Sequence, residues 1–175
     1  MPTPIGHALG GIAAAFLVSS TAASPRLTVP ILAASAAIAV APDLDIPFGS
    51  HRTYTHSIGA VAFTCTAAWI LLRGRPAAAQ AAIAIAAAHG SHLLLDWMGT
   101  DTSRPPGLMA LWPFTPDFYV SGWNVFGEVS RRYWLPEEFL LGNTLALLRE
   151  LAIIMPLLFI VWTVWSKRTV SVDSR

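Results

Sequence analysis

Residues 76–97 read PAAAQAAIAIAAAHGSHLLLDW, and this stretch decides both the fold and the place of the chemistry. It carries no charged residue before Asp96, so it is long enough and apolar enough to form a helix across a ~30 Å hydrocarbon core. Its last turns nevertheless hold His89, His92 and Asp96. Ionisable side chains are costly in apolar surroundings, so their clustering at one end of this segment indicates a functional site.

The rest of the chain is equally apolar. Its 175 residues are 54% hydrophobic and 12% charged, whereas a soluble domain has about 25% charged residues. Further uncharged runs cover residues 1–25, 27–42, 53–72 and 151–166. The pattern predicts an all-α, polytopic membrane helix bundle that forms a single integral membrane domain over residues 1–175. One soluble domain with buried helices is the weaker alternative.

We expect about five transmembrane helices, at about residues 5–23, 27–41, 55–72, 77–98 and 139–166, the last with a bend at Pro156. Residues 1–23 lack the positive n-region of a secretory signal, so we expect a retained helix. The segment at about 99–138 is rich in proline and tryptophan. Tryptophan is typical of membrane interfaces, so this segment is predicted to be an interfacial excursion.

Five crossings place the chain's turns on two opposite sides of the membrane. Arg26, Arg73, Arg75, Lys167 and Arg168 share one side, which the positive-inside rule makes cytoplasmic. The N-terminus, the loop 42–56 and the excursion share the other side, which we predict to be extracytoplasmic. The net charge of +1 favours no nucleic acid as a partner.

The ionisable residues are predicted to meet on that second side. His92 and Asp96 are four residues apart on one helix and point the same way, while the loop 42–56 adds two acids and two histidines. Carboxylates and imidazoles suit zinc, with manganese or iron as alternatives, and their number allows one or two divalent ions. The candidate metal ligands are His7, Asp43, Asp45, His51, His56, His89, His92 and Asp96, and the candidate catalytic residues are Arg52 and Asp45.

Several of these residues have a structural interpretation as well. Asp43 can be paired with Arg52, His7 can be solvated at the interface, and His89 can be a hydrogen-bonded histidine inside the bundle. Arg149 and Glu150 are most simply an ion pair within the last helix or at the interface.

Four ordered motifs resemble those of the YdjM family, described as LexA-binding, inner-membrane-associated, metal-dependent hydrolases. They are Pro42-Asp43-Leu44-Asp45, His51-Arg52-Thr53-Tyr54-Thr55-His56-Ser57, His92-Leu93-Leu94-Leu95-Asp96 and Leu111-Trp112-Pro113-Phe114. The resemblance implies a bacterial inner-membrane location, metal ligation by the motif residues with His7, and a distant similarity to zinc-dependent phospholipase C and P1 nuclease. Ile46 stands where family members often carry histidine.

The resulting expectation is a membrane-bound, divalent-metal-dependent hydrolase acting on a phosphoester of a lipid or lipid-linked substrate. Arg52 is expected to stabilise the anionic transition state, and the substrate to enter sideways from the membrane lipid. The alternative is a non-enzymatic interaction or scaffold protein with a structural metal. A transporter ranks last, because the centres of the third and fourth expected helices are uncharged.

Overall fold

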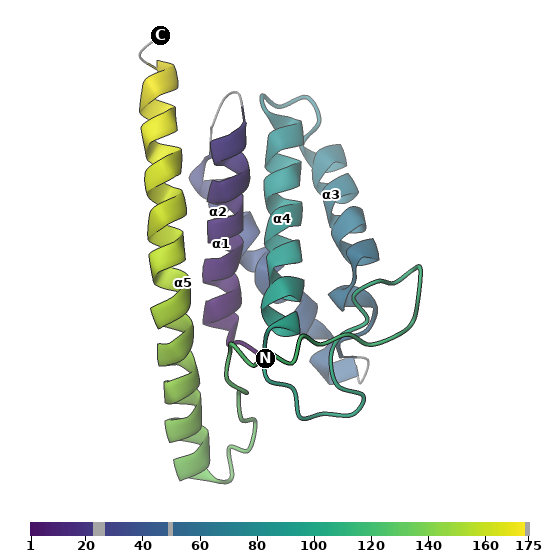
Figure 1. Ribbon diagram of the computed structural model, residues 1–175. Coiled ribbons are helices and arrows are strands. Elements are labelled where there is room, and N and C mark those ends of the chain that lie inside the picture. The colour runs from purple at the N-terminus through teal and green to yellow at the C-terminus, as the bar shows by residue number, and fades with distance from the viewer. Residues whose placement is uncertain (23–26, 49–50, 174–175) are drawn as a thin grey trace.

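The computed structural model describes residues 1–22, 27–48 and 51–173, and these residues form a helical bundle (Figure 1). Outside the helices, the described residues contain only isolated bridge pairs and no longer strand. The prediction of an all-α fold is therefore confirmed. In chain order the elements are α1 (Pro4–Thr21), α2 (Val29–Val40), η1 (Ala41–Phe48), η2 (Tyr54–His56), α3 (Ile58–Leu72), α4 (Ala78–Trp97) and α5 (Pro136–Asp173).

Capping residues set where the helices near the polar end of the bundle begin. The Thr3 hydroxyl accepts a hydrogen bond from the Gly6 N–H, and Pro4 follows at the first helical position of α1. The Ser57 hydroxyl accepts from the Ala60 N–H at the start of α3. These caps fix the first turns of α1 and α3 next to the group of polar side chains described below.

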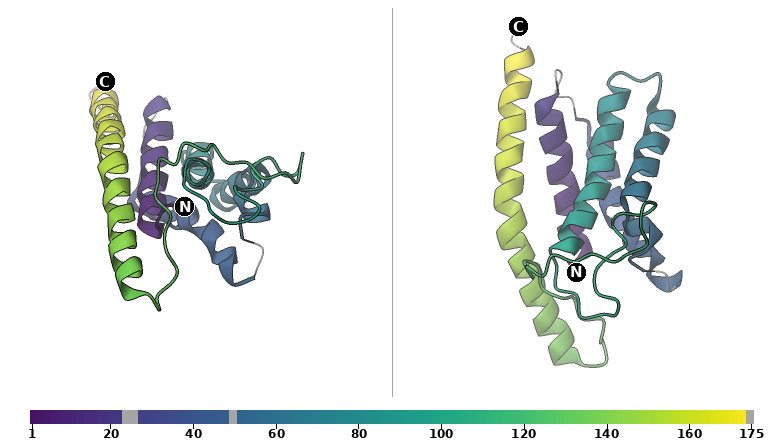
Figure 2. Two further views of the ribbon diagram at one scale, coloured as in Figure 1. Left: turned by 60° about the horizontal axis from the view of Figure 1, so that its bottom comes forward. Right: turned by 45° about the vertical axis from the view of Figure 1, so that its right-hand side comes forward.

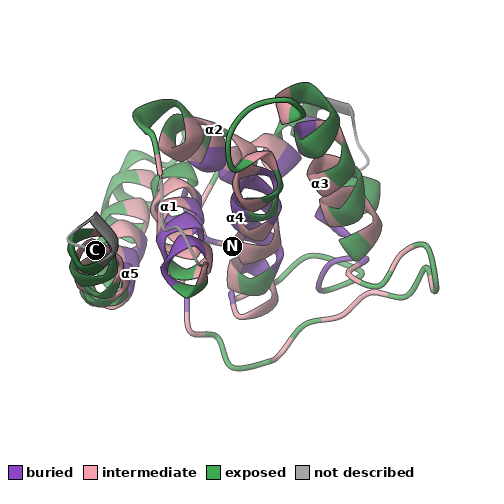
Figure 3. Ribbon diagram, turned by 90° about the horizontal axis from the view of Figure 1, so that it is seen from above, coloured by how far each residue is buried: buried purple, intermediate pink, exposed green. Residues whose placement is uncertain are grey.

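Small residues let the helices approach closely. Seen from above, α5, α1, α4 and α3 follow one another, and α2 packs behind α1 and α4 (Figure 3). A Cβ on Gly11 of α1 would lie 2.5 Å from the Ala39 Cβ of α2 and 3.3 Å from the Ala88 Cβ of α4. Contact between backbones of this kind is typical of membrane helices, where small residues provide close van der Waals packing.

Within the described residues, four helical stretches are long and apolar enough to cross a membrane: Pro4–Thr21, Val29–Pro47, Ala78–Trp97 and Pro136–Ser171. The fifth expected span corresponds to α3, which has only 15 residues and is shorter than this. Part of the segment 42–56, expected as a loop, is instead helical, because η1 continues α2 through Phe48. The expected turn at residues 24–26 lies outside the described residues.

Helix α5 is longer than expected. It runs over 38 residues without a break at Pro156, and a helix of that length measures about 57 Å at 1.5 Å per residue. Its N-terminal turns extend past the lower ends of the other helices (Figures 1 and 2). One helix therefore spans the bundle and also flanks the polar segments beneath it.

Among the described residues, the turns lie at the two ends of the bundle that their expected grouping requires. The α3–α4 turn lies at the same end of the bundle as the end of α5, and the N-terminus lies at the other end (Figure 1). The Arg168 guanidinium donates to the Ser20 carbonyl near the end of α1, which joins the first and last helices there. His7, η1, η2 and the end of α4 thus share the opposite end.

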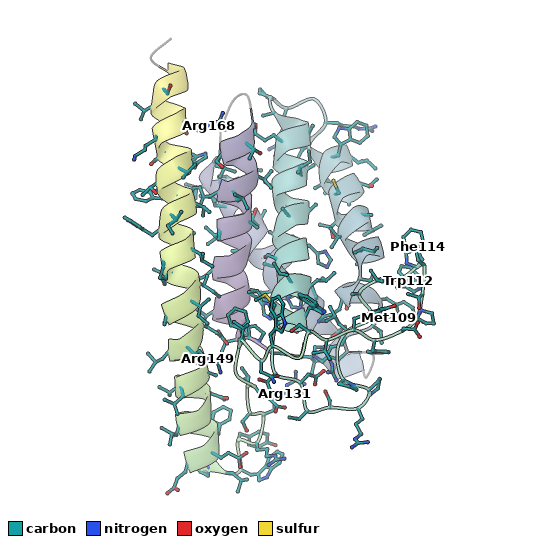
Figure 4. The ribbon with its side chains drawn as sticks, in the orientation of Figure 1. Met109, Trp112, Phe114, Arg131, Arg149 and Arg168 are labelled. Atoms are coloured by element: carbon teal, nitrogen blue, oxygen red, sulfur yellow. The ribbon has the colours of Figure 1, made fainter. Side chains whose placement is uncertain are left out.

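The segment between α4 and α5 forms an ordered cover over that end (Figure 2). The Ile58 N–H donates to the Ala110 carbonyl at 2.9 Å, and the Gly59 N–H donates to the Trp112 carbonyl at 3.0 Å. Leu108, Met109 and Phe126 are buried, and Figure 4 places Met109 and Trp112 at the lower end of α3. The excursion is therefore packed against the bundle.

Glu150 of α5 joins the start of α1 from the far end of the sequence. Its side chain is fully buried and accepts hydrogen bonds from the Thr3 N–H at 2.8 Å and the Thr3 hydroxyl at 2.6 Å. Gly6 leaves the necessary room, because a Cβ there would lie 2.5 Å from Glu150 Oε2. The expected pairing of Arg149 with Glu150 is wrong, since Arg149 donates instead to the Asn124 carbonyl at 2.9 Å.

We expect Glu150→Ala to lower the free energy of unfolding by about 2 to 4 kcal/mol, because it leaves two buried donors of Thr3 without a partner. Equilibrium unfolding in mixed micelles measures this loss. The matched control is Glu137→Ala, an exposed acid on the same helix, which should change stability by less than about 0.5 kcal/mol. Equal effects of the two substitutions would contradict the assigned role of Glu150.

Candidate metal centre

His92 presents one ring nitrogen to a group of carboxylates. Its Nδ1 lies 2.7 Å from the Ala39 carbonyl oxygen. A carbonyl only accepts, so Nδ1 carries the proton and Nε2 keeps its lone pair. Nε2 lies 3.2 Å from Asp96 Oδ2 and 3.8 Å from Asp43 Oδ1. A backbone bond that fixes the tautomer in this way is typical of metal-binding histidines.

His56 completes a four-residue group with Asp43, His92 and Asp96. Its Nε2 lies 3.6 Å from Asp43 Oδ1 and 3.7 Å from Asp96 Oδ2. One potential ligand atom from each of the four residues lies within 4.8 Å of the others. Two atoms that each bind one zinc ion at about 2.0 to 2.2 Å lie at most about 4.4 Å apart. The four distances of 3.2, 3.6, 3.7 and 3.8 Å between histidine nitrogens and carboxylate oxygens meet that limit.

The atoms of this group also lack other partners. Within the described residues, both oxygens of Asp96 and the Nε2 atoms of His56 and His92 are buried without a hydrogen bond. Buried polar atoms in proteins are almost always bonded, so a group of unsatisfied atoms that face one another indicates a missing shared partner. A divalent cation between them would satisfy Asp96 Oδ2 and the Nε2 atoms of His56 and His92, and the residues therefore fit a metal ion.

His7 faces the same two carboxylates from α1. Its Nε2 lies 3.3 Å from Asp96 Oδ1 and 4.0 Å from Asp43 Oδ2, which are the oxygens turned away from His92. The His7 ring is fully buried and stacks on His92 with 3.9 Å between ring centroids. Among the described residues neither of its nitrogens has a hydrogen-bond partner. The structure thus brings His7 to the group, not to a solvated position.

A second group consists of Asp45, His51 and His56. Asp45 Oδ1 accepts from His51 Nδ1 at 2.7 Å, and Asp45 Oδ2 lies 3.3 Å from His56 Nδ1. The Thr55 hydroxyl donates to the same carboxylate. Asp45 therefore holds both imidazoles, and His56 links the two groups through its two ring nitrogens. This arrangement can hold a second ion or orient the ligands of the first.

The pKa values of the two histidines near Asp45 are shifted in opposite directions. Burial favours the neutral His56 ring, but the neighbouring carboxylates of Asp43 and Asp45 outweigh this and raise the pKa of His56 to about 9. Burial lowers the pKa of His51, despite its hydrogen bond to Asp45, so the His51 ring is neutral at pH 7. Without metal, His56 is cationic at pH 7, and metal binding must displace its proton.

His89 stands apart from both groups. Its Nε2 donates to the Thr55 carbonyl at 2.9 Å, and its Nδ1 accepts from the Thr64 hydroxyl at 2.8 Å. Both nitrogens are therefore occupied, and neither faces the carboxylates. The prediction of His89 as a ligand does not match this geometry. Its contact with Thr55 instead fixes the backbone next to His56.

Arg52 lies beside the site but is paired with neither Asp43 nor Asp45. Its guanidinium forms an ion pair with Asp101, which also accepts from the Gly107 N–H at 2.6 Å. Burial opposes ionisation of Asp101, but its hydrogen bonds from Ser103 and Gly107 and the charge of Arg52 lower its pKa. No local sequence pattern predicts this pair, because the two residues are 49 positions apart.

A cavity of about 960 Å³ adjoins both groups. Asp43 and His51 lie in its wall, together with Arg52, Arg131 and Arg132 from the surrounding segments. Val40, Leu44 and Ile46 provide apolar surface in the same cavity. Asp43 and His51 can therefore be reached by a molecule that carries both an anionic and an apolar part.

The fold and these donor atoms define a small polytopic membrane protein with a His/Asp site that can hold a metal ion. The family model of the YdjM inner membrane protein matches residues 1–170. The chain therefore belongs to this family, and the resemblance expected from the motifs is confirmed. No curated protein and no solved structure matches the chain, so a similarity to zinc-dependent phospholipase C or P1 nuclease is not shown.

We expect the purified protein to bind a transition metal through the four-residue group, and His92→Ala to lower the metal content at least tenfold. His89→Ala is the matched control, because both nitrogens of His89 are used within the protein, and it should retain more than half of the metal. Elemental analysis after gel filtration measures both. Metal content below about 0.2 equivalents in the unsubstituted protein would contradict the assignment.

Proposed function

We propose that this protein is a membrane-bound, divalent-metal-dependent hydrolase that acts on a phosphoester of a lipid or lipid-linked substrate. The observation that supports the proposal is the group of unsatisfied ligand atoms of Asp96, His56 and His92, whose fourth member, Asp43, lies in the wall of a cavity lined by arginines. Zinc is the expected metal, with manganese or iron as alternatives, as one or two ions. A bound divalent ion polarises a phosphoryl oxygen and lowers the pKa of a water molecule at the site.

The residues of the chain supply binding and proton transfer in this proposal. Asp101 holds Arg52 at the cavity wall, where the guanidinium can contact phosphoryl oxygens and stabilise added negative charge. Asp45 accepts from His51 Nδ1, so His51 Nε2 is the acceptor of a neutral ring, and it faces Arg131 Nη2 at 3.4 Å. That nitrogen can take a proton from water and return it to a leaving group. Asp45 then serves to orient His51.

The alternative function is a non-enzymatic interaction or scaffold protein with a structural metal. Asp43, His56, His92 and Asp96 already supply four protein ligands, and four-ligand sites are typical of structural zinc. This alternative predicts metal binding and metal-dependent stability without turnover.

We expect the metal-loaded protein to hydrolyse phosphoester substrates, and Arg52→Ala to lower kcat/KM at least tenfold while the metal content is unchanged. The reason is that Arg52 contacts the substrate in this proposal and ligates no metal. Release of phosphate or alcohol from bis(p-nitrophenyl) phosphate and from short-chain phosphatidic acid in mixed micelles measures the activity. Arg75→Ala, at the opposite end of the bundle, is the control. Full metal loading without turnover on either substrate would favour the scaffold.

We propose that the site faces the extracytoplasmic side of the inner membrane, because the arginines of the α3–α4 turn and the end of α5 lie at the other end. In a Cys65→Ala background, Asp117→Cys marks the site end and Arg75→Cys the opposite end; both positions are exposed. A membrane-impermeant maleimide should label Asp117→Cys in intact spheroplasts and Arg75→Cys only after lysis. The reverse pattern would place the site in the cytoplasm.

A further inference from the structure

The three arginines in the wall of the cavity differ in their partners. Arg52 is paired with Asp101, and Arg132 Nη1 lies 3.3 Å from Glu138 Oε1. Arg131 has no carboxylate within ion-pair distance among the described residues. Its side chain contacts His51, whose Nε2 accepts from Arg131 Nη2 at 3.4 Å. Figure 4 places Arg131 below the lower ends of α1 and α4.

The contact with His51 brings Arg131 to the edge of the second His/Asp group. The His51 ring is held by Asp45 through Nδ1 at 2.7 Å, so Arg131 is one imidazole ring away from that carboxylate. A guanidinium has five N–H donors in a planar fork, and the neutral His51 ring uses one of them. The remaining donors lie at a cavity that is large enough for a ligand.

The apolar wall of the same cavity comes from the segment that also supplies the acids. In η1, Asp45 is buried, whereas Leu44 is 69% exposed and Ile46 is 38% exposed. Both aliphatic side chains belong to the cavity lining. Exposed leucine and isoleucine beside buried acids indicate a ligand with an alkyl chain, since a purely polar ligand gains nothing from this surface.

We propose that Arg131 forms a binding site for the anionic phosphoryl group of an amphiphile, whose alkyl chain contacts Leu44 and Ile46. Arginine suits this role because its fork binds two phosphoryl oxygens at once. The choice of a phosphoryl ligand rests on the proposed function. The inference adds that Arg131 selects the anionic headgroup, and that Leu44 and Ile46 distinguish a lipid phosphate from free phosphate.

The test measures binding without turnover, using the full chain and alkylphosphonates, whose C–P bond is not hydrolysed. Isothermal titration compares octylphosphonate, methylphosphonate and octyltrimethylammonium. Octylphosphonate should bind at least tenfold more tightly than methylphosphonate, and octyltrimethylammonium should not compete. Equal binding of the two phosphonates would contradict the alkyl contact and favour free phosphate as the ligand. Equal binding of the cation would contradict anion selection.

The variants separate a specific site from general positive charge. Arg131→Gln should weaken octylphosphonate binding at least tenfold, and Arg131→Lys should recover part of the loss. Arg132→Gln is the matched control, since Arg132 lines the same cavity but is paired with Glu138, and it should change binding by less than threefold. Leu44→Ser should remove the preference for the octyl chain. Equal losses in Arg131→Gln and Arg132→Gln would overturn the proposal.

The outcome also separates this inference from the proposed hydrolase. Arg131-dependent binding in a protein that shows no turnover would support this site and contradict the hydrolase. Turnover with no effect of Arg131→Gln on phosphonate binding would contradict this site alone.

Discussion

The structure depends on a group of buried carboxylates and imidazoles that satisfy one another poorly. Asp96 is 3% exposed, and within the described residues both of its oxygens lack a hydrogen bond. A carboxylate in such surroundings is destabilising unless positive charge is close to it. Protonated His56 supplies one such charge, and a divalent cation supplies more. Close packing makes the meeting possible, because small residues such as Gly11, Ala39 and Ala88 bring α1, α2 and α4 near enough for short side chains to converge.

Much of this arrangement could be predicted from the sequence, because it depends on two simple constraints. Uncharged runs of sufficient length gave helices whose observed ends lie within a few residues of those expected, except in α5. Alternation of the chain between two sides of a membrane then placed His7, the segment after α2 and the end of α4 at the same end. His92 and Asp96 were paired by helical spacing alone, and their separation of 3.2 Å agrees with it.

The features that could not be predicted depend on contacts between distant parts of the chain. His89 and His92 lie on the same helix, so their positions in the sequence do not separate a ligand from a structural histidine. The hydrogen bonds of His89 with Thr55 and Thr64, which come from other segments, show that both of its ring nitrogens are used inside the bundle. Glu150 stands next to Arg149 and was expected to pair with it, whereas its partner Thr3 is 147 positions away. The pairing of Arg52 with Asp101 has no local pattern. The final helix exceeded its expected length because charged residues at both ends continue it beyond its apolar part.

The short helix η1 supports the proposal that a substrate comes from membrane lipid. Its sequence alternates acids with aliphatic residues, and the fold turns Asp45 inward while Leu44 and Ile46 remain exposed. A protein that acts on a water-soluble phosphoester would be stabilised by polar residues at those two positions, because exposed aliphatic surface beside water has no compensating contact. At the end of a membrane bundle the same surface can contact alkyl chains. The burial of Asp45 and the exposure of Leu44 and Ile46 therefore both agree with a position of η1 at the boundary between lipid and water.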